Sequence, residues 1–179
     1  MIIVFSTSSP VASIAAIEDG RTVFERSAEV RHRASESILG WYDELSPKRV
    51  EGFVADLGPG GFTGTRVAIV AAKTLAFALG TRCAGLPSFD FIDEGKAVVP
   101  ARRGFYLTRN GMVEGWPEGG VGYGPDAPTS IHPLASRAVG QLDRLVWVEP
   151  DFLMPDYVLE PSISTPKKPY AVEVHARVE

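Results

Sequence analysis

The sequence predicts an α/β fold in which helices pack on a mixed β-sheet. Three observations lead to this prediction. Strand-like segments joined by turn signals open the chain, a helical pattern follows them, and a glycine-rich turn then joins a further strand to a long apolar helix. This order of elements is typical of a sheet covered by helices. The 179 residues are enough for one domain or two small lobes.

Three strands are predicted at the start of the chain. Residues 2–5 form an unbroken apolar run, which favours a strand buried on both faces. After a break at residues 6–10, a second strand covers residues 11–17. Asp19-Gly20 is a tight-turn signal, and the alternating residues 21–27 form the third strand. We expect these strands to form an antiparallel meander.

A helix, a strand, a second helix and a short strand are expected next. Residues 34–45 carry apolar side chains at helical spacing, with Ser35 as the expected N-cap and Ser46 with the following proline as the stop. A strand over residues 50–57 leads through the glycine-rich turn into the long helix. Residues 82–86 form the strand that leaves this helix.

The second half of the chain has weaker patterns. Strands are expected within residues 97–108, and Asn110-Gly111 predicts a hairpin turn into another strand. Residues 117–130 predict a loop that is too poor in apolar side chains to pack. A short helix is then expected at residues 134–143 and a strand at residues 145–148. The tail, residues 150–179, is expected to be mostly extended.

Composition and charge argue against several classes of function. The formal net charge is −4, and nucleic acids are bound mainly by clustered Lys and Arg, so we expect no unaided binding to RNA or DNA. The one cysteine, Cys83, cannot form a disulfide within the chain and is expected to be a buried thiol. The first residues lack the pattern of a signal peptide, and no apolar run approaches ~18 residues. We therefore expect a cytoplasmic protein that does not enter a membrane.

The glycine-rich turn has two possible roles. Its glycines could bring backbone amides to an anion at the helix N-terminus; they are Gly58, Gly60, Gly61 and Gly64. The spacing fits neither common phosphate-binding loop. The last glycine precedes Thr-Arg rather than Lys followed by Ser or Thr, and the final glycine of GxGxxG is missing. A tight strand-to-helix turn is the simpler interpretation, and nucleotide binding is the alternative.

The long helix has two different faces. At 100° per residue, one side carries small and aliphatic residues that suit a core: Ala68, Ala71, Ala72, Leu75 and Leu79. The other side combines large apolar residues with cations: Arg66, Ile69, Val70, Lys73 and Phe77. An apolar patch rimmed by cations favours a protein partner. Burial under a second lobe is the alternative.

These residues resemble a known family. The turn and helix resemble the TsaB (YeaZ-like) family, the accessory subunit for making threonylcarbamoyl-adenosine in bacterial tRNA. The matching turn consists of Gly58, Pro59, Gly60, Gly61, Phe62, Thr63, Gly64, Thr65 and Arg66. Residues 72–76 (AKTLA), Leu86-Pro87-Ser88 and residues 101–104 (ARRG) with Tyr106 match further segments. The similarity covers residues 2 to about 108.

The resemblance implies a fold, a role and partners. The fold would be actin-like (ribonuclease H-like), with an N-terminal lobe at residues 1–93 and a smaller, irregular lobe at residues 94–179. The chain would be a non-catalytic subunit that binds a TsaD-type threonylcarbamoyltransferase through the long helix. A TsaE-type ATPase is a possible further partner, tRNA would be met only indirectly, and a homodimer would form in isolation.

Departures from the family concern the chemistry. The His-x-x-x-His metal motif of the catalytic relative is absent after the long helix, where Asp90 and Asp93 are expected to be solvated carboxylates. Ser6 stands where an acidic residue would organise the magnesium ion of bound ATP. The N-terminal serines have no GxSxG elbow and no nearby histidine, so a serine hydrolase is not expected. We predict no catalytic residue, cofactor or metal; a small actin-fold ATPase or phosphotransferase is the alternative.

Overall fold

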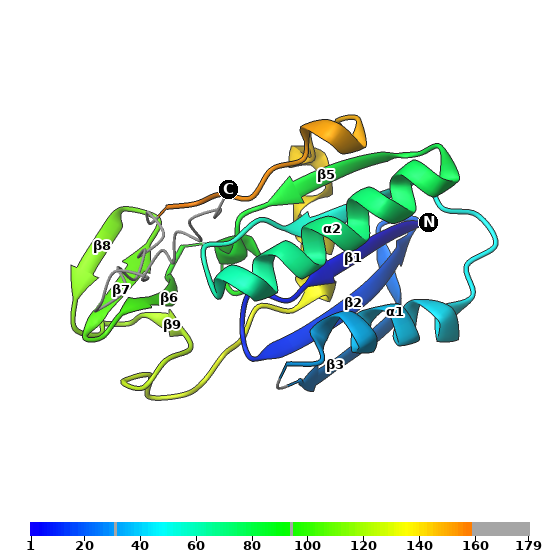
Figure 1. Ribbon diagram of the computed structural model, residues 1–179. Coiled ribbons are helices and arrows are strands. Elements are labelled where there is room, and N and C mark those ends of the chain that lie inside the picture. Colours follow the sequence, from blue (N-terminus) through cyan, green and yellow to red (C-terminus); the bar gives the residue numbers. More distant parts are fainter. Residues whose placement is uncertain (31, 94, 159–179) are drawn as a thin grey trace, which may run out of the picture.

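The computed structural model describes residues 1–30, 32–93 and 95–158, and it contains two β-sheets (Figure 1). The larger sheet has the strand order β3-β2-β1-β4-β5. Its strands are β1 (Ile2–Ser6), β2 (Val11–Glu18), β3 (Arg21–Glu29), β4 (Gly52–Asp56) and β5 (Arg82–Leu86). The first three strands are antiparallel neighbours, whereas β1, β4 and β5 run parallel. This arrangement confirms the predicted meander and mixed sheet.

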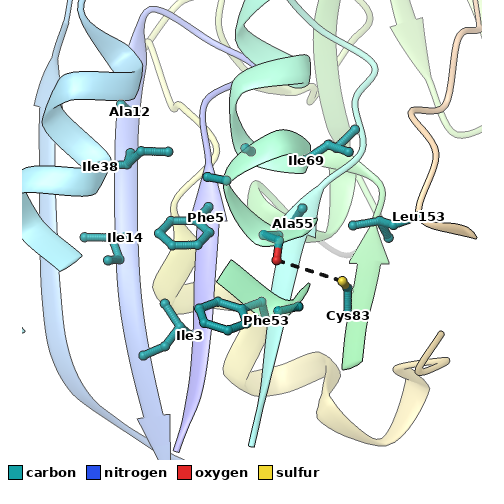
Figure 2. Close-up of a cluster of buried hydrophobic side chains, with 14 of the residues drawn as sticks. Ile3, Phe5, Ala12, Ile14, Ile38, Phe53, Ala55, Ile69, Cys83 and Leu153 are labelled. Carbon is teal, nitrogen blue, oxygen red and sulfur yellow. Dashed lines mark hydrogen bonds between the residues drawn. The ribbon is translucent and has the colours of Figure 1, made fainter. Parts of the chain in front are cut away.

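Both faces of the larger sheet are covered. Helices α1 (Ala34–Leu45) and α2 (Phe62–Leu79) pack on one face, where Ile3, Phe5 and Phe53 point toward them (Figure 2). The 3₁₀ segment η2 (Ala135–Arg144) packs on the other face, against Val4 and its neighbours. Consecutive residues of β1 therefore enter two separate cores, as expected for a strand buried on both faces.

The bounds of α1 match the predicted range of residues 34–45, apart from its N-cap residue. Helix α1 begins at Ala34, so Arg33 is the N-cap residue and Ser35 is not, contrary to the prediction. The guanidinium of Arg33 binds the carboxylate of Glu36 through two hydrogen bonds, which ties together the first turn. The helix ends at Leu45, and the C-cap residue Ser46 adopts a left-handed conformation with φ 46° and donates its N–H to the carbonyl of Tyr42.

The smaller sheet has the order β8-β7-β6-β9. Its strands are β6 (Ala97–Arg102), β7 (Phe105–Thr108), β8 (Gly111–Glu114) and β9 (Val121–Gly122). A turn at Arg103-Gly104 divides the predicted strand region 97–108 into β6 and β7. The predicted second hairpin is confirmed, but its turn residues are Arg109-Asn110 and Gly111 begins β8. The predicted loop at 117–130 is partly wrong, because β9 pairs with β6 and Tyr123 is buried in a third core with Val99 and Leu107. One large aromatic ring supplies the apolar area that the segment otherwise lacks.

The chain returns to the larger sheet after β9. Segment η2 covers the predicted helix at 134–143, but it is a 3₁₀ helix and contains the weak helix former Gly140. The predicted strand at 145–148 is reduced to a single bridge between Val148 and Cys83. A further 3₁₀ turn, η3 (Pro150–Phe152), lies beside α2, and another, η1 (Ser88–Phe91), follows β5. Part of the range expected to form the second lobe thus packs on the first sheet. The expected tail beyond residue 158 lies outside the described residues.

Helix α2 has the length and composition of a membrane span, with 18 residues and a mean hydropathy of 1.3. This differs from the expectation that no apolar stretch reaches that length, because Arg66 and Lys73 are the only charged residues of the helix. In the structure, small residues on one side of α2, Ala68 and Ala72 among them, are buried against the sheet. The apolar composition thus serves packing only on the side of the helix that faces the sheet.

Cys83 is buried in the core beneath α2, as expected. Its thiol donates a weak hydrogen bond to the carbonyl of Ala72 at 3.9 Å (Figure 2). Burial raises the pKa of the Cys83 thiol, which keeps the thiol protonated and poorly reactive.

Candidate functional site

The glycine-rich turn between β4 and α2 packs directly against the turn that follows β1. A Cβ atom on Gly60 would lie 2.4 Å from the carbonyl oxygen of Ser8, and one on Gly64 would lie 2.0 Å from that of Thr7. The N–H of Gly61 donates to the Ser8 carbonyl at 2.6 Å. These glycines therefore allow two stretches of backbone to touch, which supports a tight turn over an open phosphate cradle.

Thr7 strengthens this contact with its side chain. Its hydroxyl donates to the carbonyl of Gly64 at 2.6 Å and accepts the N–H of Ala68 at 3.0 Å. The start of α2 is therefore fixed to the end of β1 through backbone and side chain together.

A buried carboxylate lies beside this turn, and sequence reasoning missed it. Asp56, the last residue of β4, accepts hydrogen bonds from the hydroxyls of Ser6 and Ser8 at 2.7 and 2.5 Å. The hydroxyl of Ser88 and the N–H of Gly58 donate to its other oxygen. Burial raises the pKa of Asp56, and these four hydrogen bonds oppose that rise.

The parallel pairing of β1 and β4 explains the position of Asp56. Phe5 pairs with Ala55, so the next residues, Ser6 and Asp56, lie at the same edge of the sheet. A carboxylate is thus present next to Ser6, but it comes from a different strand. Asp56 is fully buried and four donors surround it, so it joins strand ends rather than facing a ligand.

A cleft of about 920 Å³ lies between the glycine-rich turn and the loops of the smaller sheet. Its walls include Thr7, Gly61, Tyr123 and two histidines, His32 and His132. The described residues that line it include no Lys, Arg, Asp or Glu. Charged side chains normally bind the phosphates and the magnesium ion of a nucleoside triphosphate, so this lining does not favour such a ligand.

His132 lies at the wall of the cleft, stacked on the Tyr123 ring with 4.9 Å between centroids. Its Nε2 atom is 3.1 Å from the hydroxyl of Ser130, as in a nucleophile and base pair. However, Nδ1 is buried with no hydrogen-bond partner within the described part of the chain, so no acid orients the ring. Burial lowers the pKa of His132, which favours the neutral ring.

The two aspartates after α2 have structural partners. Asp90 is 3% exposed and accepts hydrogen bonds from Arg109 and Arg144, so the expectation of a solvated carboxylate was wrong for it. The fold brings Arg109 from the smaller sheet and Arg144 from η2 to this point. Asp93 accepts the N–H groups of Gly95 and Lys96 at 2.9 Å and closes a turn. Across residues 1–30, 32–93 and 95–158, no cluster of His, Cys, Asp and Glu could hold a metal ion.

The outer face of α2 differs in part from the predicted one. Val70 and Phe77 are 60% and 80% exposed, so they form an apolar surface. Ile69 is only 4% exposed and packs with Leu153, which corrects its assignment to the surface (Figure 2). Leu79, expected in the core, is exposed in the last turn before the Gly80 cap.

Residues 150–157, which we call the strap, lie beside this face. The ammonium group of Lys73 donates to the carbonyl of Leu153 at 3.2 Å. Arg66 donates from Nε to the Tyr157 hydroxyl at 2.8 Å, and the Tyr157 ring stacks on Phe62. Two predicted interface residues, Arg66 and Lys73, thus already contact the chain itself.

Two grooves border Val70 on the α2 surface. One, of about 360 Å³, lies between α2 and the strap and is lined by Arg66, Lys73 and Met154, among others. The other, of about 160 Å³, lies between α1 and α2, and Leu39 and Leu75 contribute to its apolar wall. Val70 therefore stands on a ridge between two hollows, a shape that can interlock with another helix.

Comparison with known proteins identifies the fold. No family model and no curated protein matches the chain. The chain is similar to the solved structure of YeaZ from Pseudomonas aeruginosa, with a TM-score of 0.69 and 20% sequence identity. It is also similar to an uncharacterized protein described as similar to peptidase YEAZ from Pseudomonas aeruginosa, with a TM-score of 0.65 and 19% identity. Each alignment covers 88% of this chain and 99% of the other, so the chain has the mixed α/β fold of these proteins.

Proposed function

We propose that the chain is a TsaB-like, non-catalytic subunit with an actin-like (ribonuclease H-like) fold. It binds a TsaD-type threonylcarbamoyltransferase in the cytoplasm and supports threonylcarbamoyl transfer to tRNA adenosine. Two observations support this proposal. The structure is similar to that of YeaZ, and the sequence of residues 58–66 matches the family turn. A homodimer forms through the same surface when the partner is absent, and tRNA and a TsaE-type ATPase are reached only within the complex.

The exposure of Val70 and Phe77 carries the proposal. They are seven residues apart, about two helical turns, and so lie on the same side of α2. The opposite side of this helix is buried in the core of the larger sheet. Large apolar side chains that a packed helix leaves exposed mark a contact surface for another protein.

The described sites support a role without catalysis. No charged side chain is found among the described residues that line the cleft, and the hydroxyls of Ser6 and Ser8 bind Asp56. The alternative, an actin-fold ATPase or phosphotransferase, needs a group that organises magnesium near the end of β1. Asp56 is the nearest carboxylate there along the paired strands, and it is fully buried.

Affinity capture from the native cell tests the proposal. The tagged chain should retain a TsaD-type protein, and the double variant Val70→Glu, Phe77→Glu should lose it because both changes put charge into the apolar contact. Val23→Glu, on the exposed strand β3, is the matched control and should retain the partner. Equal recovery with the double variant would show that α2 is not the contact surface.

A further inference from the structure

The strap has one buried anchor and a distal part without buried residues. Leu153 is buried in the same core cluster as Ile69 and Cys83, and this side chain anchors the segment (Figure 2). Beyond it, Met154 and Tyr157 are 63% and 46% exposed. In this distal part, the N–H of Asp156 donates to the carbonyl of Leu57 at 2.8 Å. Because none of residues 154–157 is buried, they can leave α2 when this bond opens, while Leu153 stays in the core.

The distal strap occupies part of the outer face of α2. Tyr157 accepts the hydrogen bond of Arg66 and stacks on Phe62 with 5.5 Å between ring centroids. The Arg66 guanidinium lies over the same Phe62 ring at 3.9 Å, so the three side chains form one cluster. Met154, Pro155 and Tyr157 also form one wall of the groove beside Val70. The strap therefore blocks a partner that would bind to Arg66 and to this groove.

We propose that residues 154–157 are an intrachain competitor that a binding partner must displace from the N-terminal half of α2. This inference rests on the proposed function, since it concerns access to the same surface. A closed strap blocks the surface that the partner needs. The apparent affinity of the chain for the partner is therefore the intrinsic affinity multiplied by the fraction of molecules in which the strap is open. Contacts of this size correspond to one or two kcal/mol, so loss of the Tyr157 ring should tighten binding by about 5- to 30-fold.

Two variants separate competition from a merely structural contact. Tyr157→Ala removes the ring stack and the hydrogen bond, whereas Tyr157→Phe removes only the hydrogen bond to Arg66. With a purified TsaD-type protein from the same organism, we expect the largest gain in affinity for Tyr157→Ala and a smaller one for Tyr157→Phe. Unchanged or weaker binding by Tyr157→Ala would overturn the proposal, since the strap would then be neutral or part of the interface.

Hydrogen exchange of the wild-type chain with and without this TsaD-type protein distinguishes the two proposals. If both are right, amides of α2 become protected while the Asp156 amide exchanges faster, because its bond to Leu57 is broken. Protection of α2 together with the strap would keep the proposed function and overturn displacement. No protection of α2 would overturn both proposals.

Discussion

The hydroxyl of Ser6 donates a 2.7 Å hydrogen bond to the carboxylate of Asp56, and this contact joins the ends of β1 and β4. Ser8 and Ser88 bring the following loop and the end of β5 to the same carboxylate. Three strand ends beneath the glycine-rich turn are therefore held by one buried acid. This cluster positions the start of α2, and hence the surface that we propose to bind the partner.

The raised pKa of Asp56 predicts a defined pH dependence of stability. The folded state binds its proton more tightly than the unfolded chain, whose aspartate pKa is about 3.9. Protonation of Asp56 therefore stabilises the folded state fully below that value, and this stabilisation is lost as pH rises through the folded-state pKa. Thermal unfolding should show wild type gaining stability relative to Asp56→Asn as pH falls through this window. A relative loss of stability on acidification would contradict the direction of the pKa shift.

The close contact at Gly64 predicts opposite effects for two helical glycines. Gly64→Ala should lower the free energy of unfolding by about 1–3 kcal/mol, because the new methyl group would overlap the Thr7 carbonyl. Gly40→Ala in α1 is the matched control, since nothing lies within 4 Å of the added carbon. It should raise stability by about 0.5–1 kcal/mol. Denaturant titration of both variants measures these changes, and equal effects would show that Gly64 is not tightly packed.

The burial of Asp90 predicts that its ion pairs matter for stability. Asp90→Asn should lower the free energy of unfolding by about 1–3 kcal/mol, because the charge-assisted hydrogen bonds of Arg109 and Arg144 weaken. Glu36→Gln in the exposed pair with Arg33 should leave the melting temperature nearly unchanged. Calorimetry of the two variants gives the comparison. A stability loss as large for Glu36→Gln as for Asp90→Asn would refute the distinction.

The described residues that line the cleft carry no charge, which predicts that the isolated chain neither binds nor hydrolyses ATP measurably. At about 1 mM ATP with magnesium, the upper end of common KM values, calorimetry should show no binding heat and phosphate release should match the buffer blank. Tight binding with turnover would favour the ATPase alternative. Loss of that turnover in a Thr63→Ala variant, whose exposed side chain lines the cleft, would then place the activity there.

The sequence predicted the strands and helices of the larger sheet because their periodicity is local. It missed features that depend on contacts between distant segments. In the sequence, Asp90 is simply a polar residue that follows a helix. Its partner Arg144 lies 54 residues further along the chain, and only the fold brings the two together. Ile69 belongs to the outer face by helical spacing, but Leu153 from the strap covers it. Asp56 could have been placed beside Ser6, had the parallel register of β1 and β4 been known.

The most direct test of the account is the dissociation constant between the chain and a TsaD-type protein, measured by titration calorimetry. The double variant Val70→Glu, Phe77→Glu should raise this constant by about 100-fold or more, because central apolar contacts carry most of the energy of an interface. Both side chains are exposed, so the variant should fold as the wild type does. Unchanged affinity in a folded double variant would contradict the central claim that α2 is the partner-binding surface.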